Sequence, residues 1–376
     1  CVAELAAPLF LRYLRATESA LAVKAELDVR GSVDLLSGEW SLSAAVSAAV
    51  FTVGDAAELY SADAATPLRL AAGSLVFGGY AAAREIELVA TNATFVGNGT
   101  FDASGRGEAQ VSGDGRGVST PPNNYNSNGD VRSTALTTYS RYRGGSGASH
   151  GGMGGHGDPT ENAQTRNPYG DLETPTSLGS GGGKGVVNVF YQNSYGNWWS
   201  RWYSSHWWRH ERAGGAGGGS INLTVANSLV LNGSATALLA NGLAGQDGVR
   251  THTTNEKVAG GGGGAGGSVY VSALSFEGSG RVQAAGGTGG SGGYNSQTWT
   301  AWNYLQHGGG GGGGGRIAIH CTTCASLADA RFGADGARVV GGLTLDARGG
   351  AAGSTKRVVP SEGPRRGAPG PIFSDA

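Results

Sequence analysis

Short stretches in which apolar and polar residues alternate recur along the chain, and such alternation predicts half-buried β-strands. Three of them follow a pair of glycines: GGSINLTV at 218–225, GGSVYVSA at 266–273 and GGRIAIHC at 314–321. Their first apolar residues, Ile221, Val269 and Ile317, are each 48 positions apart. REIELVA at 84–90 starts a fourth unit without the glycines, and GKGVVNVF at 183–190 starts a further strand. The pattern therefore predicts strand-forming repeats.

Each repeat offers one or two more strand-like pieces. One piece has the form apolar-x-(Ala or Val)-x-Gly and occurs as LDVRG at 27–31, FDASG at 101–105, LLANG at 238–242, VQAAG at 282–286 and LDARG at 345–349. Another precedes it and reads ATFVGNG, SLVLNGS or LSFEGSG. Short strands that recur at a fixed period without helices between them favour a solenoid over a sandwich. Only residues 5–27 have a helix-like pattern.

The fold class predicted from these repeats is all-β: a parallel β-helix (solenoid) with glycine-rich corner segments and long loop insertions. We expect one elongated solenoid over residues 1–350 and an extended C-terminal tail at 351–376. The expected insertions are residues 108–184, 191–213 and 290–308.

In such a fold equivalent side chains of successive coils stack about 4.8 Å apart. The repeats therefore predict columns of like side chains, which we call ladders. Ile221, Val269 and Ile317 should form one apolar ladder. Another should contain Phe95, Leu229 and Leu274. A column of alanines should mark a narrow corner: Ala103, Ala240, Ala284 and Ala347.

Glycine supplies 71 of the 376 residues, and eight of them are consecutive in GGGGGGGGRIAI at 308–319. The run is either a flexible linker or backbone packed where side chains do not fit. The strand spacing survives the glycines, which favours packing. We expect the runs to lie side by side at the strand spacing, as extended polyglycine helices bonded laterally to each other.

Tryptophan is concentrated in two inserts, and exposed tryptophan at such density marks a surface that is meant to be covered. The residues are Trp198, Trp199, Trp202, Trp207, Trp208, Trp299 and Trp302. Subunit contact and packing of the inserts on themselves are equally favoured interpretations, with sugar binding below both. Nucleic acid is disfavoured as a partner because the net charge is −1 and only 15% of residues are charged.

Several features suggest a secreted glycoprotein. Four sequons could carry N-linked glycans, at Asn92, Asn98, Asn222 and Asn232, and Asn98 and Asn232 are expected at equivalent positions of their coils. Cys321 and Cys324 are expected to form a local disulfide in an oxidising compartment, whereas Cys1 would pair elsewhere. No apolar run is long enough for a transmembrane helix. The chain starts without a methionine or a signal peptide, so we expect a processed chain or a fragment.

No enzyme, metal site or cofactor is predicted. Asp28, Asp102 and Asp346 recur at one place in the repeat, which indicates an exposed ladder of turn residues and not a catalytic pair. The histidine pairs lack a Cys or carboxylate partner at a familiar spacing, so solvated loop histidines are favoured over zinc ligands. These pairs are His150 with His156 and His206 with His210.

The glycine block before RIAI, followed by LDARGG, resembles glycine-rich β-helix proteins of protist and algal cell surfaces. Components of tubular mastigonemes, the stiff hairs on flagella, are among them. The resemblance covers residues 84–107 and 214–350 and implies a secreted, glycosylated structural role. The function we expect is a structural subunit of an extracellular filament or sheath that self-associates or joins other subunits. The alternative is a monomeric carbohydrate-binding adhesin that uses the tryptophan-rich loops.

Overall fold

A computed structural model describes residues 2–5, 9–17, 20–118, 144–157, 165–195, 202–248, 259–292, 308–324, 337–340, 342–354 and 366–375. All regular structure in these residues is β-structure. The strands are β1 (Val2–Leu5), β2 (Leu9–Ala16), β3 (Ala20–Val23), β4 (Leu27–Leu42), β5 (Val46–Ser61), β6 (Leu68–Phe77), β7 (Tyr80–Ala82), β8 (Glu85–Val96), β9 (Thr100–Asp102), β10 (Gly185–Tyr195), β11 (Trp202–Arg212), β12 (Ser220–Asn232), β13 (Ala237–Leu239), β14 (Ser268–Gly278), β15 (Arg281–Gln283), β16 (Arg316–Thr323), β17 (Ala337–Val340), β18 (Leu343–Asp346) and β19 (Ile372–Asp375). Within these ranges there is no helix that could cross a membrane.

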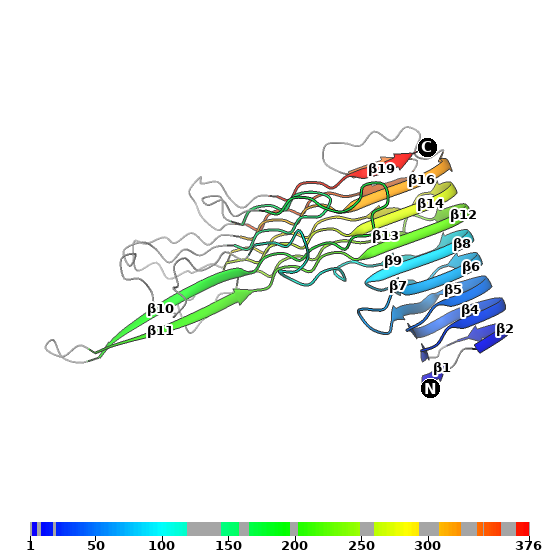
Figure 1. Cartoon of the computed structure of the whole chain (residues 1–376), viewed down its shortest axis with the longest axis horizontal. Helices are drawn as coiled ribbons and strands as arrows, with labels where there is room; N and C mark the ends of the chain where they lie inside the picture. Colours follow the sequence, from blue (N-terminus) through cyan, green and yellow to red (C-terminus); the bar gives the residue numbers. More distant parts are fainter. Residues whose placement is uncertain are drawn as a thin grey trace.

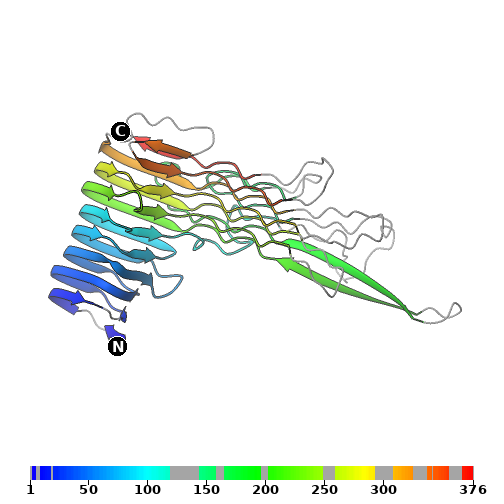
Figure 2. The same cartoon turned by 180° about the vertical axis from the view of Figure 1, so that it is seen from behind.

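One 17-stranded sheet curls into a half-barrel, shown at the right of Figure 1 and from behind in Figure 2. Its long strands are parallel neighbours in the order β2, β4, β5, β6, β8, β12, β14, β16 and β19. The short strands β7, β9, β13, β15 and β18 form a second parallel row. Parallel pairing in register lets successive turns of chain stack the same kind of side chain, which is the physical basis of the repeat.

The apolar core lies inside the curl of the sheet, where alternate residues of strands such as β4, β5, β8 and β12 are buried. The ladder of Ile221, Val269 and Ile317 is confirmed, because the three residues are paired in register and fully buried. Ile86 extends this ladder on β8. The alanine column is also confirmed. The N–H of each alanine but the last donates, at 2.7–2.8 Å, to the carbonyl of the residue just before the next alanine of the column. All four are fully buried: Ala103, Ala240, Ala284 and Ala347.

The second predicted ladder is wrong. Leu229 is paired with Phe276, and Leu274 is half-exposed on the outside of the sheet. Phe95 is paired with Leu231. A β-bulge explains the error, because β12 has two residues between Val225 and Ser228 where β14 has only Leu274. The extra residue shifts the count by one position, which exchanges the inner and outer faces.

The helix-like pattern at residues 5–27 does not form a helix where the structure describes it. The segment contributes β2 and β3. Strand β2 pairs with β4, and Leu11 and Leu14 pack against the apolar core. Tertiary pairing therefore overrides the local pattern.

The glycine-rich chains leave the sheet on one side and run beside one another, as Figures 1 and 2 show. We call this body the glycine lattice. Its first layer contains residues 103–107, 240–248, 284–292 and 347–354, its second layer 213–219, 259–267, 308–315 and 366–371, and its third layer 144–157 and 178–185, with 108–118 packed on the third layer. Backbone N–H groups bond to carbonyls within each layer and between layers. The expectation of laterally bonded polyglycine chains is confirmed, and the linker interpretation is wrong for these segments.

Residues 308–315 show why eight glycines are consecutive. Every third N–H, those of Gly309, Gly312 and Gly315, donates to one neighbouring chain, residues 284–292, at 2.7–2.9 Å. A period of three is that of an extended left-handed helix without internal hydrogen bonds. A Cβ at any position of the run would lie within 3.0 Å of a carbonyl oxygen on a neighbouring chain. All sides of this chain are therefore occupied by backbone.

Two segments that the sequence suggested were peripheral belong to this architecture. Described parts of the predicted insertion 108–184 supply the third layer of the glycine lattice. The predicted tail contributes residues 366–371 to the second layer and β19 to the sheet, where Ile372 is paired with Ile317. Both predictions are corrected for the same reason: short glycine-rich pieces find backbone partners that no local pattern reveals.

Candidate functional site

The end of the glycine lattice that lies away from the sheet brings the flanks of the inserts together. Gly248, which precedes one undescribed segment, donates its N–H to Ser291 O at 2.7 Å, beside the start of another. Gly145, shortly after a third undescribed segment, donates to Gly260 O at 3.0 Å, on the far side of the first. We call this end the distal end. Inserts far apart in the sequence thus begin from one place.

A hairpin of β10 and β11 projects from the distal end (Figure 1). Its two strands are antiparallel, with an uninterrupted register from Gly185↔Arg212 to Tyr195↔Trp202. In this register Trp207 is opposite Phe190 and Trp208 is opposite Val189. Three of the predicted contact residues, Trp202, Trp207 and Trp208, therefore share one strand. The other four lie outside the described residues: Trp198, Trp199, Trp299 and Trp302.

The base of the hairpin is fixed to the lattice by polar contacts. Lys184 Nζ lies 2.7 Å from Glu211 Oε2, and both side chains are about one-third exposed. Just beyond β11, the N–H of Ala213 donates to Gln246 Oε1 at 3.2 Å. Surface ion pairs contribute little to stability. The two contacts described here instead fix the position of the hairpin, because the lattice chains continue directly into β10 and β11 at this point.

Three of the four sequon asparagines are exposed: Asn92, Asn98 and Asn232. Asn222 is half-buried on β12, and its Oδ1 is buried without a hydrogen-bond partner among the described residues. The expected equivalence of Asn98 and Asn232 is wrong, because Asn232 is paired with Val96. The two asparagines are two residues out of register, because Asn232 is the last residue of β12 whereas Asn98 lies in the turn after β8.

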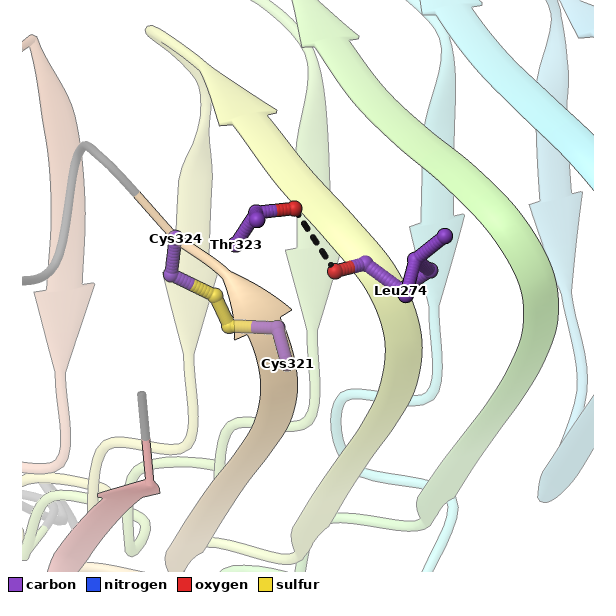
Figure 3. Close-up of a disulfide and its surroundings, with 4 residues drawn as sticks. All are labelled: Leu274, Cys321, Thr323 and Cys324. Carbon is purple, nitrogen blue, oxygen red and sulfur yellow. Dashed lines mark hydrogen bonds between the residues drawn. A yellow bond between two sulfur atoms is a disulfide. The ribbon is translucent and has the colours of Figure 1, made fainter.

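Cys321 and Cys324 are joined as a disulfide (Figure 3), and their Cα atoms are 5.9 Å apart. Both residues are buried in the apolar core at the end of β16. Next to them Thr323 Oγ1 donates to Leu274 O at 3.0 Å. Cys321 takes the place that Ala273 holds on β14, so the disulfide lies against the core where β16 ends. Cys1 lies outside the described residues.

The histidines differ more than the sequence suggested. His150 is fully buried in the third layer, so its assignment to a solvated loop is wrong. His156 is half-buried, and its Nδ1 is buried without a partner among the described residues. His206 and His210 lie on β11, where only the backbone is described. No cluster of three or more His, Cys, Asp or Glu side chains that could hold a metal ion occurs among the described residues.

One sequence signal could have placed His150 in the interior. It lies in SGASHGGMGGHG at 146–157, a stretch in which half of the residues are glycine. A side chain in such a chain must face either a gap between layers or solvent. Burial of the imidazole lowers the pKa of His150 to about 4, because desolvation disfavours the charged form.

The three aspartates do not form one exposed ladder, which corrects that expectation. Asp102 and Asp346 lie in one column of paired residues on the short strands, with Leu239 and Gln283 between them. Asp28 lies on a long strand instead, where it is paired with Ser47. Asp346 is buried and makes a bidentate contact with Arg348 at 2.7 and 2.9 Å. Asp102 accepts from Tyr80 at 2.8 Å, and Asp28 accepts from Ser47 at 2.8 Å. Each carboxylate has a local hydrogen-bonding role.

Comparison with family models, with curated proteins and with solved structures finds no match for this chain. Its function must therefore be inferred from its own geometry.

Proposed function

We propose that the chain is a structural subunit of a secreted, N-glycosylated extracellular filament or sheath, of the kind formed by the flagellar-hair proteins that its repeats resemble. In this proposal the curled sheet is the wall of a parallel β-solenoid, and the distal end makes the contacts with a neighbouring subunit. The self-association partner is a second copy or another filament protein.

The observation that carries the proposal is the glycine lattice between the sheet and the hairpin. Its chains run away from the sheet and are bonded to one another along their length, for example by Gly309, Gly312 and Gly315 to one neighbour. Bending such a body would stretch many backbone hydrogen bonds at once. The lattice therefore acts as a stiff spacer, which is a mechanical role and requires no bound substrate.

The aromatic hairpin supports a contact role at the end of that spacer. A two-stranded hairpin is at best marginally stable in water by itself. Strands β10 and β11 pair only with each other among the described residues, and they carry Phe190, Trp207 and Trp208. Tryptophan and tyrosine are enriched where subunits meet. We propose that these residues contact another subunit.

The proposal is tested by shortening the hairpin. Replacing residues 188–209 by Asn-Gly retains the Val187↔His210 pair and the Lys184–Glu211 contact, and joins them by a two-residue turn. We expect the unaltered chain to form oligomers or fibres without added sugar, and the shortened chain to remain monomeric. Light scattering after size exclusion and electron microscopy measure both. Ala351→Lys on the exposed face of the lattice is the control and should assemble normally.

The result also separates the filament subunit from the carbohydrate-binding adhesin. The adhesin would be favoured if the chain stays monomeric without sugar and is retained on a polysaccharide column only when the hairpin is intact. If the shortened chain still assembles and its thermal unfolding is unchanged, the hairpin does not make the contact between subunits.

A further inference from the structure

Residues 165–178 run across the outer face of β14 and β16, and we call them the strap. Side chains of these strands donate to strap carbonyls: Ser268 to Ser177, Arg316 to Tyr169 and His320 to Glu173, at 2.6, 2.9 and 2.6 Å. Ala318 lies between the inward-facing Ile317 and Ile319, so strand alternation places it on the outer face, yet it is fully buried. We attribute its burial to the covering strap.

Most of the strap is exposed, and its attachment is concentrated at Tyr169. The Tyr169 N–H donates to His150 O at 2.9 Å, and the phenol donates to Leu178 O at 2.5 Å and contacts Ser180 Oγ at 2.7 Å. The Tyr169 ring lies against the His150 ring, with centroids 4.8 Å apart. The strap is therefore held over the sheet by one aromatic anchor, a few polar contacts and the buried Pro175.

His150 lies directly beneath this anchor. Its Nδ1 is 2.8 Å from Gly266 O, and since a carbonyl only accepts, Nδ1 carries the proton of the neutral ring. Nε2 is then a bare acceptor, buried and without a partner among the described residues. A Cβ on Gly170 would lie 3.2 Å from His150 Nε2, 3.2 Å from Ser177 Oγ and 3.3 Å from Arg316 Nε, so these atoms converge on the strap backbone.

The surroundings oppose a second positive charge at this place. Burial is the main cause that lowers the pKa of His150 to about 4, and the Arg316 guanidinium on β16 adds repulsion. The other titratable group that faces the ring is Tyr169, whose pKa burial raises to about 12, so it stays neutral. Asp171 lies near Arg316, and hydrogen bonds from Thr174 lower its pKa, so it stays ionised while the histidine titrates.

We propose that the strap is an acid-released cover of the outer sheet face, with His150 as its trigger. Protonation of the buried ring favours the state in which the strap has lifted and the imidazolium meets water. Release uncovers Ala318 and the neighbouring pair of rings, Tyr270 and His320, whose centroids are 5.4 Å apart. This device is independent of the hairpin contact proposed above.

The sign and size of the effect follow from proton linkage. The covered state depresses the pKa of His150 from its ordinary value of 6.5 to about 4, so the covered state is fully favoured above pH 6.5 and loses that advantage as pH falls toward 4. Between pH 7 and pH 5 the ratio of open to covered strap should rise about 20-fold, if the open state restores the ordinary pKa. Below pH 4 the dependence should end.

Hydrogen exchange with mass spectrometry of the whole chain tests this, with rates corrected for the intrinsic effect of pH. We expect the peptide 165–178 to open about 20-fold more at pH 5 than at pH 7, while the peptide 308–315 in the second layer stays protected. His150→Gln keeps a donor for Gly266 O but cannot titrate, and its strap should show no such acid response. His156→Gln is the matched control, and it should respond as the unaltered chain does.

Two outcomes would overturn the proposal: an unaltered strap that opens equally at both pH values, or a His150→Gln strap that still opens in acid. His320→Gln distinguishes the other histidine in contact with the strap, since an acid response abolished by this change alone assigns the trigger to His320 instead. Should His150→Gln not fold, NMR of histidine-labelled unaltered protein replaces it. One of the seven histidines should then titrate near 4, the pH at which the acid dependence of strap opening levels off, and its absence would contradict the trigger.

Discussion

At the scale of single residues, the glycine lattice is specified by the positions that have no side chain. Chains at its margin carry side chains at every third position, as Ala285, Thr288 and Ser291 do in residues 284–292. The central chain 308–315 has no such free side, because its neighbours approach from every direction. A glycine count alone therefore indicates little, whereas the spacing of the non-glycine residues indicates which chains are central.

Gly312→Ala should destabilise the protein strongly. The added methyl group would collide with Gly264 O, which accepts a hydrogen bond of 2.8 Å from the Gly287 N–H. Since the neighbours are backbone atoms, they cannot rotate away, and we expect a loss of about 3 kcal/mol in the free energy of unfolding. Urea denaturation measures it. Thr288→Ala, at an exposed position on the adjacent chain, should cost about 0.5 kcal/mol or less, and equal costs would contradict the packing argument.

At the scale of elements, register decides which apolar residues form the core. The spacing of Ile221, Val269 and Ile317 carries through from sequence to structure because no bulge lies between them and their strand starts. Past the bulge after Val225 the same counting fails, and Leu274 turns to the outside. Periodicity is thus reliable only up to the first irregularity of a strand.

Leu229→Ala and Leu274→Ala separate the two registers. Leu229 is fully buried between Ala93 and Phe276, so its truncation leaves a cavity and should cost about 3 kcal/mol. Leu274 is 50% exposed, and its truncation should cost about 0.5 kcal/mol or less. Thermal unfolding of both variants gives the comparison. If both variants lose similar stability, Leu274 belongs to the core and the bulge is disproved.

At the scale of the whole molecule, the sheet and the lattice form two bodies of different backbone geometry that share their chains. Each excursion begins after a short strand such as β13 or β15 and returns directly into a long strand such as β14 or β16. The proposed glycans lie on the sheet, whereas the hairpin lies at the distal end. The proposed glycans and the proposed subunit contacts are therefore separated along the molecule, so the two proposals are compatible.

Peptide mass spectrometry of protein secreted from eukaryotic cells should find glycans on Asn92, Asn98 and Asn232, whose side chains are exposed. Asn222 should be unmodified, because a glycan there would have to displace the contacts that bury its side-chain oxygen. Asn98→Gln should remove the mass of one glycan and leave the others. Bare Asn98 and Asn232 in native material would refute the glycoprotein proposal.

The sequence by itself determined the strand repeat, the first apolar ladder, the alanine column and the pairing of Cys321 with Cys324, because each depends on local alternation or short spacing. Only the tertiary structure decided the register after the bulge, the third layer and the burial of His150. Backbone hydrogen bonds between glycines carry no side-chain signature, so their partners are set by which chains come to lie together. The residues that carry the proposed acid response therefore become visible only once the strap is folded over them.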